Sequence, residues 1–342
     1  MGTSRGAGRR GRNDEVVVGV GTPVPTLGGR TAPFVNLDNA GATPAFRAAV
    51  DAVEEMLPYI ASTHGGSGFK SRICAQAVDE ARATIAEFVG ADPDRDTVVF
   101  TDNTADAVSL VDGAVVVAGV SGVTGVVERV HDLAARAHAG GRRILVDATH
   151  LAGHRPLDML PHGDQRHLDF VAISAAHMYA PFGCAALIGR RDQVAGEPDT
   201  ANVVGVVALA AAARTLQDLG TDRVARHEEA LLNQATERLV NVPGVRLHAP
   251  SPKDADRVGI IPFTLDGVDP DLVAAILDHE HGIGVHSNRE VVRASFGCYS
   301  DPRDVHRLVG ALHRIAAGEV DGDYWCDDDG TWRSEGDVSS VA

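Results

Sequence analysis

The residues best suited to chemistry gather in one stretch, VAISAAHMYAPFG, which runs from Val171 to Gly183. An apolar run predicts a strand over Phe170–Ser174, and the short loop after it carries His177. In α/β proteins, loops at the carboxyl ends of strands present reactive groups to bound ligands. An imidazole titrates near neutral pH, so it can act as a general base in such a loop. His177 is therefore the first candidate catalytic residue.

The elements that must position this loop are short β-rich runs separated by helical patterns. That alternation predicts a largely parallel α/β sheet. The expected strands are Thr97–Phe100, Ala114–Ala118, Arg143–Asp147, Phe170–Ser174 and Ala185–Ile188.

A second unit follows a helical stretch that is broken at Gly220. Asp269-Pro270 and Asp301-Pro302 each place a capping residue before a proline, which predicts a helix start. Thr43-Pro44 predicts a helix start in the same way. The expected strands of this second, smaller α/β unit are Val245–Leu247, Val258–Leu265 and Val291–Phe296.

These patterns divide the chain into four parts. We expect a disordered basic arm over residues 1–30 and a large α/β domain over residues 31–220. A small carboxyl-terminal α/β domain is expected over residues 221–318, followed by an acidic tail over residues 319–342.

Composition excludes several classes of function. The formal net charge of −16 argues against nucleic acid or an anionic membrane surface as a partner. No run of 18 apolar residues and no signal-peptide pattern occurs, and the four cysteines are scattered without a C-x-x-C pair. We therefore expect a cytoplasmic protein with reduced thiols. Lysine is scarce: the chain has only Lys70 and Lys253.

Seven stretches, taken in chain order, resemble motifs of the class V aminotransferase and cysteine desulfurase family, which has pyridoxal-phosphate (PLP) fold type I. The resemblance implies a PLP cofactor, an amino-acid substrate and a homodimer. The stretches are NLDNAGATP, HGGSGFKSR, VVFTDNTADAVSLV, VSGVTG, ILVDATHLAGHRPLDM, VAISAAHMYAPFG and VVRASFGCYSD.

The resemblance also implies roles for individual residues. Asp147 takes the position of the aspartate that holds the pyridine nitrogen protonated. Thr104 and Ser174 take positions that contact the cofactor phosphate. Arg293 takes the position that pairs with the substrate carboxylate. His150 stands beside the cofactor, where the family motif has glutamine.

One departure removes the central group of this chemistry. His177 occupies the position of the lysine that forms the Schiff base with PLP, and an imidazole cannot form that bond. Neither Lys70, before a helix, nor Lys253, in a loop of the second domain, is a suitable replacement. The asparagine of the family's VSNVTG motif is Gly122 in this chain.

The chain is also shorter than the family pattern in three places that border the expected site. The predicted helix ending near Val111 runs almost directly into the strand at Ala114. A loop is missing after GRRDQVAGEPD, and only VHSNRE separates Gly284 from Val291. The first gap would shorten the sheet of the large domain to about five strands.

Three interpretations follow. The first is a degenerate family member, a pseudoenzyme or partner protein without lysine-based PLP catalysis. An alternative is an enzyme that binds PLP or pyridoxamine phosphate without a covalent bond and uses His177 as a base. A second alternative is a conventional aminotransferase, desulfurase or lyase. His150, His154 and His177 share the presumed site face, but no metal-binding motif accompanies them, so no metal is predicted.

Overall fold

The computed structural model describes residues 16–62, 68–194 and 202–334. Its centre is a five-stranded sheet, the number predicted for the large domain. The three interior strands are buried and apolar except for the polar or charged residue that ends each of them, as expected for strands covered on both faces. In order across the sheet the strands are β4 (Asp96–Thr101), β8 (Ala185–Arg190), β7 (Phe170–Ser174), β6 (Ile144–Asp147) and β5 (Val115–Ala118).

The sheet is mixed. β5, β6 and β7 are parallel to one another, whereas β8 is antiparallel to both of its neighbours, β7 and β4. Asp147 at the end of β6 is in register with Ala172 of β7, so the carboxyl ends of these two strands lie side by side.

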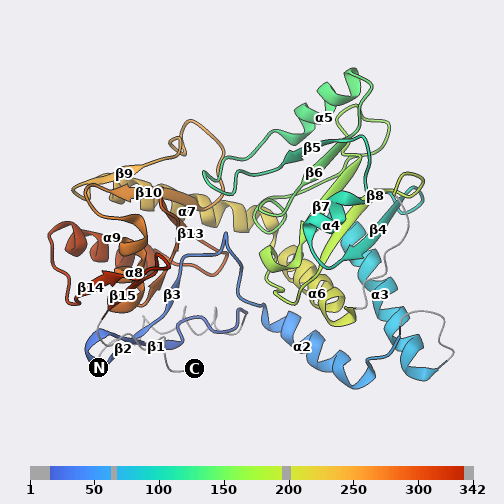
Figure 1. Cartoon of the computed structure of the whole chain (residues 1–342). Coiled ribbons are helices and arrows are strands. Elements are labelled where there is room, and N and C mark those ends of the chain that lie inside the picture. The colour runs from blue at the N-terminus through green and yellow to red at the C-terminus, as the bar shows by residue number, and fades with distance from the viewer. Residues whose placement is uncertain (1–15, 63–67, 195–201, 335–342) are drawn as a thin grey trace, which may run out of the picture.

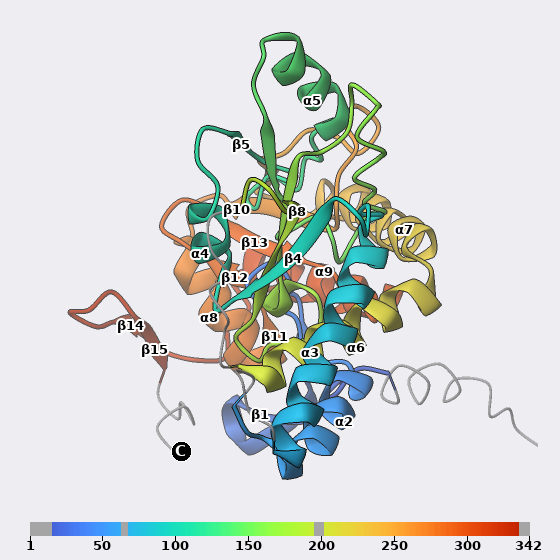
Figure 2. The ribbon, with the colours of Figure 1, turned by 90° about the vertical axis from the view of Figure 1, so that its right-hand side faces the viewer.

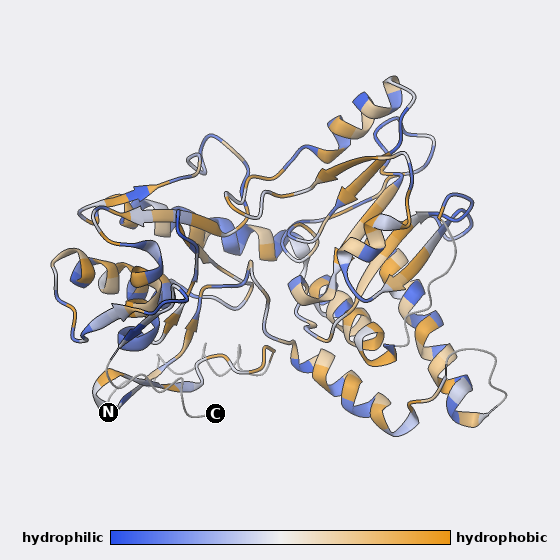
Figure 3. Cartoon of the chain, viewed as in Figure 1, coloured by the Kyte–Doolittle hydropathy of each residue, from blue (hydrophilic) through white to orange (hydrophobic). Residues whose placement is uncertain are grey.

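Alternate residues of each strand enter different cores, as the period of two along a strand requires. Val146 and Ile173 join a large core formed with α2 (Arg47–Met56), α3 (Phe69–Phe88) and α6 (Val203–Leu219). Leu145 and Ala172 face the opposite side, where they form a small core with α4 (Thr104–Ser109). Figure 2 shows α3 and α4 on opposite sides of the sheet, and Figure 3 shows the apolar character of the central strands.

The second unit lies beside the first in Figure 1 and has its own hydrophobic core. Its antiparallel sheet has the order β12 (His286–Ser287), β13 (Val292–Ser295), β10 (Ile260–Leu265), β9 (Val245–Leu247). Its helices are α7 (Thr221–Leu239), α8 (Pro270–His281) and α9 (Pro302–Ala316).

The predicted starts of α8 and α9 are confirmed. Asp269 accepts hydrogen bonds from the first turn of α8, and Asp301 forms a capping box with Asp304 at the start of α9. The predicted break at Gly220 is confirmed too: α6 and α7 meet there at a bend of 76°. Within the described residues no single helix is long and apolar enough to cross a membrane, although α6 and α7 together meet that test by length and composition.

Two expectations about the amino-terminal region are wrong. Residues 16–30 are not disordered, because Val17 is fully buried and β1 (Pro23–Thr26) pairs with β2 (Arg30–Pro33) across η1 (Leu27–Gly29). Residues 1–15 of that arm lie outside the described residues.

The second error concerns Thr43, which does not cap a helix. α2 begins at Arg47 after Phe46, and the Thr43 side chain bonds to a distant loop instead.

Short strands complete the fold. β3 (Val35–Asn36) pairs in parallel with β11 (Ile283–Gly284), so the segment after the amino-terminal hairpin joins the core of the second unit. In the tail, β14 (Tyr324–Cys326) pairs with β15 (Trp332–Ser334). The remaining elements are α5 (Val130–Ala139), η2 (Leu57–Tyr59) and η3 (Ala175–His177).

Candidate functional site

The six predicted site residues meet at the carboxyl edge of the large sheet. Asp147 ends β6, Ser174 ends β7, and His177 ends the short helix η3 that follows β7. The remaining residues reach this edge from three other segments: Thr104 from the start of α4, His150 from the loop after β6, and Arg293 from β13 of the second unit.

His177 and His150 form the centre of this cluster. Their rings meet edge to face with centroids 4.6 Å apart, and His177 Nδ1 lies 3.3 Å from Ser174 Oγ. Burial lowers the pKa of His177, and His154 and Arg293 lower it further, although a hydrogen bond to the Ala40 backbone opposes them. His177 is therefore a neutral imidazole at pH 7, in the state that can accept a proton.

The same causes act more strongly on His150. Burial, followed by the nearby His177, His154 and Arg293, lowers the pKa of His150 to about 4, and Asp147 only partly opposes this. The ring also lies close to the backbone: a Cβ added at Gly122 would be 3.0 Å from His150 Nε2. Two neutral imidazoles thus occupy the middle of the cluster.

Asp147 and Thr104 are linked through one residue. The backbone N–H of Thr149 donates to Asp147 Oδ1 at 3.0 Å, and the hydroxyl groups of Thr149 and Thr104 lie 3.3 Å apart. Asn103 caps α4 by accepting the N–H of Asp106 at 2.9 Å. The helix start expected to bind a phosphate therefore carries a carboxylate, Asp106, in its first turn, which disfavours an anion there.

Arg293 is held by groups of this chain. Its Nη1 donates to the carbonyl oxygen of Gly122 at 2.7 Å, and its Nη2 lies 3.6 Å from Asp38 Oδ1. Arg293 Nε and Asp38 Oδ1 are buried without a hydrogen-bond partner among the described residues. A substrate carboxylate would have to compete with Asp38 for this guanidinium.

The loop that carries His177 is held by segments distant in sequence. Thr43 Oγ1 donates to the carbonyl of Ala176 at 3.0 Å and accepts the N–H of Tyr179 at 2.7 Å. Tyr179 has a φ of 62°, which is unusual for a residue with a side chain. On the other side, a Cβ added at Gly153 would lie 2.6 Å from the carbonyl oxygen of His177. Packing and backbone bonds together determine the path of this loop.

The hydroxyl of Tyr179 supports a prediction about stability. It accepts the backbone N–H of Cys298 at 2.8 Å inside the protein. We expect Tyr179→Phe to lower the free energy of unfolding by about 1–3 kcal/mol, because the N–H is left buried without a partner. Urea denaturation measures this. Tyr59→Phe, at a partly exposed ring, should stay within about 0.5 kcal/mol of the parent. An equal loss in both variants would contradict the prediction.

Neither lysine is part of the cluster. Lys70 is exposed in the first turn of α3, and Lys253 is exposed in the loop before β10. The residues present therefore do not fit a cofactor held by a Schiff base.

Sequence reasoning missed several residues that shape the site. Asp38 follows β3 and faces Arg293, and Thr43 was expected to cap a helix. His154 has a partner that the sequence did not indicate: its Nδ1 lies 2.8 Å from Oε1 of Glu228, which is fully buried on α7. These partners are 74 or more residues apart, so local patterns carried no signal for them.

Comparison with known proteins identifies the family. The model of the aminotransferase class-V family matches residues 35–115, 112–198 and 194–308. The chain belongs to the aminotransferase class-V family. It is 27% identical to a cysteine desulfurase of Haloferax volcanii, over 82% of this chain and 89% of that protein. It is 26% identical to a probable cysteine desulfurase of Streptomyces coelicolor, over 82% of this chain and 92% of that protein.

Solved structures agree on the fold. A cysteine desulfurase of Thermococcus onnurineus NA1 superposes with a TM-score of 0.74 at 23% identity, covering 83% of this chain and 95% of that one. A NifS-like protein of Rickettsia africae gives a TM-score of 0.70 at 15% identity, covering 83% of this chain and 99% of that one. The fold is PLP fold type I, as predicted, and the chain is a cysteine desulfurase-like protein.

The class V match also bears on the missing segments. It is split near residues 112–115 and 194–198, at the first two places where segments were predicted to be absent. The alignment with the Haloferax volcanii protein spans 390 positions, more than the 342 residues of this chain. That relative therefore contains segments that this chain lacks. The third gap, between Gly284 and Val291, stays a prediction.

Proposed function

We propose that this chain keeps the class V fold without the lysine-dependent PLP reaction, and that it acts as a binding partner or regulator of another protein. The observation that carries the proposal is His177 at the lysine position, in a loop held by its neighbours. Because both lysines of the chain are exposed outside the cluster, no amine replaces the missing one.

Other residues of the cluster support this proposal. Arg293 faces Asp38, the hydroxyl of Thr104 faces that of Thr149, and Asp106 places negative charge at the start of α4. Groups that would contact a substrate carboxylate or a phosphate are thus engaged within the chain or opposed by its charges.

The curated relatives are named cysteine desulfurases, which would suggest sulfur transfer. The thiols of Cys184 and Cys298 do not favour that activity. Burial raises the pKa of Cys184 to about 12, and burial raises that of Cys298 to about 12 as well. The thiolate is the reactive form of cysteine, so these two thiols are unreactive at neutral pH.

The decisive experiment looks for a covalent bond between PLP and the full-length protein. The protein is incubated with PLP, reduced with borohydride and analysed by intact-mass and peptide mass spectrometry. We expect no adduct beyond the level seen in a Lys70→Arg/Lys253→Arg variant, which has no lysine side chain. A stoichiometric adduct at Lys70 or Lys253, with a stable visible absorption band, would overturn the proposal.

His177 itself favours a second candidate, an enzyme that binds PLP or pyridoxamine phosphate non-covalently. Bound in this way, the cofactor would supply an electron-accepting ring. Asp147 would face the pyridine nitrogen, and Ser174 would present its hydroxyl. His177, neutral at pH 7, would accept a proton, and the contact of its Nδ1 with Ser174 Oγ at 3.3 Å would orient the ring.

Calorimetry with pyridoxamine phosphate separates the two candidates. The enzyme with a non-covalent cofactor requires a dissociation constant for pyridoxamine phosphate well below millimolar. Asp147→Ala and His177→Ala should each weaken that affinity at least about 10-fold. The proposal of a partner or regulator without PLP chemistry predicts no such binding in the parent protein. Lys70→Arg, at an exposed lysine outside the cluster, is the matched control, and its affinity should equal that of the parent.

A further inference from the structure

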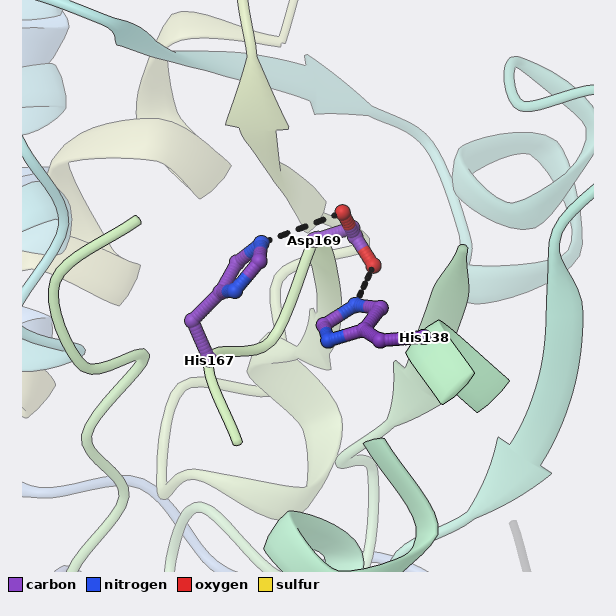
Figure 4. Close-up of side chains that lie close together, drawn as sticks. All are labelled: His138, His167 and Asp169. Atoms are coloured by element: carbon purple, nitrogen blue, oxygen red, sulfur yellow. Dashed lines mark hydrogen bonds and ion pairs between the residues drawn. The ribbon is translucent and has the colours of Figure 1, made fainter. Parts of the chain in front are cut away.

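A second cluster of chemistry-bearing side chains lies at the amino-terminal ends of β6 and β7, opposite the ends that carry the site around His177. It consists of His138, near the end of α5, and His167 and Asp169, just before β7 (Figure 4). One ligand-type atom from each residue lies within 4.8 Å of the others. Asp169 is buried and both histidines are half-buried. The cluster shares no residue with the site around His177.

The hydrogen bonds of this cluster determine which nitrogen of each ring carries a proton. His138 Nδ1 lies 2.7 Å from the carbonyl oxygen of Gln165, and His167 Nδ1 lies 2.7 Å from that of Asp164. A carbonyl oxygen can only accept, so each Nδ1 must be the donor. In a neutral ring the proton is then on Nδ1, and Nε2 presents a lone pair.

Both lone pairs face the same carboxylate. His138 Nε2 lies 2.8 Å from Asp169 Oδ2, and His167 Nε2 lies 3.2 Å from Asp169 Oδ1. Lone pairs and a carboxylate repel one another unless positive charge lies between them. Protonating both rings would place two cations in rings stacked at 4.4 Å, which is unfavourable. A single bound cation satisfies all three groups.

The surroundings match those of known metal ligands. Each Nδ1 donates to a backbone carbonyl, and Asp169 Oδ2 also accepts the backbone N–H of Ile144 at 2.9 Å. Such outer contacts orient metal-binding histidines and carboxylates.

We propose that His138, His167 and Asp169 bind one divalent transition-metal ion of the Zn²⁺ type through two Nε2 atoms and a carboxylate oxygen. Zn²⁺ binds imidazole nitrogen and carboxylate oxygen at about 2.0–2.2 Å, usually with four ligands. Three protein ligands leave the fourth position to water. The ion would join the end of α5 to the start of β7.

The test is calorimetry of the full-length protein, stripped of metal with EDTA, titrated with Zn²⁺. We expect one ion per chain. His138→Ala and His167→Ala should each weaken binding by more than about 100-fold, since loss of an outer-shell partner alone costs about 10- to 100-fold. His131→Ala is the matched control: His131 is on the same helix and its Nδ1 meets the carbonyl of Arg166, but it lies outside the cluster. Its affinity should be unchanged.

Two outcomes overturn the proposal. One is the absence of binding tighter than millimolar, and the other is stoichiometric binding that survives in the His138→Ala/His167→Ala variant. Circular dichroism establishes whether the variants fold. If they do not, X-ray absorption of the zinc-loaded parent protein decides: two imidazole ligands and a carboxylate support the proposal, and any other ligand set refutes it.

Discussion

His154→Ala should lower the free energy of unfolding by about 2–3 kcal/mol, because a buried hydrogen-bonding group that loses its partner costs about that much. His154 Nδ1 lies 2.8 and 3.0 Å from the two carboxylate oxygens of Glu228, which is fully buried. Arg155 also lies near Glu228, but its Nη1 is 3.9 Å from Oε2. Without the imidazole, the carboxylate is left in the interior without its main partner.

Urea denaturation at pH 7 measures this loss. His248→Ala is the control, because the His248 ring is exposed and bonds only to Thr264 among the described residues; it should change stability by less than about 0.5 kcal/mol. A His154→Ala variant within 1 kcal/mol of the parent would show that water or Arg155 replaces the imidazole fully.

His150 should make the protein less stable as the pH falls from about 6.5 to about 4. Its pKa is about 4 in the folded protein, mainly because of burial, against 6.5 when exposed. Between these values the unfolded chain binds a proton that the folded protein does not, so protons favour unfolding. With 1.36 kcal/mol per pKa unit, and a discount for the part of the ring that remains exposed, the loss is roughly 2–3 kcal/mol.

The matched variant is His150→Gln, which keeps a polar side chain but removes the titrating group. Unfolding free energies of parent and variant are measured at pH 7 and at pH 4. Acidification should destabilise the parent by roughly 2–3 kcal/mol more than the variant, since all other titrating groups are shared. Parallel pH profiles would mean that the His150 ring is hydrated in the folded protein.

Much of the fold followed from local patterns. β7 has the predicted bounds, Phe170–Ser174, because an apolar run before a polar loop can be recognised without knowing its neighbours. The starts of α8 and α9 were predicted for a similar reason: a capping Asp and the following Pro act within one turn of helix.

The errors arose where distant contacts outweigh local preference. Thr43 has the residue type and position of a helix cap, but its hydroxyl bonds to the His177 loop, more than 130 residues away. Composition predicted disorder up to residue 30, yet Val17 is buried against the large core. Propensity is a weak guide wherever tertiary packing supplies a better partner.

The candidate site was only partly predictable. The order of the motifs along the chain identified the six residues that lie together at the carboxyl ends of the strands. The missing lysine could be recognised from residue type alone. The Asp38–Arg293 contact joins residues that are far apart in the sequence and has no local signature. The same holds for His138 and Asp169, whose relation depends on which ring nitrogen faces a backbone carbonyl.

In the loop from Ala175 to Gly183, the path of the backbone does not depend on the side chain at position 177. Its backbone bonds run to Thr43, Phe46, Cys184 and Asn202, and the His177 side chain contributes none of these. A different side chain at position 177 would therefore inherit the same backbone and the same surroundings. An ancestral exchange of lysine for histidine would have removed a reactive amine at little cost in folding. The same property makes position 177 a suitable place to install a new reactive group by design.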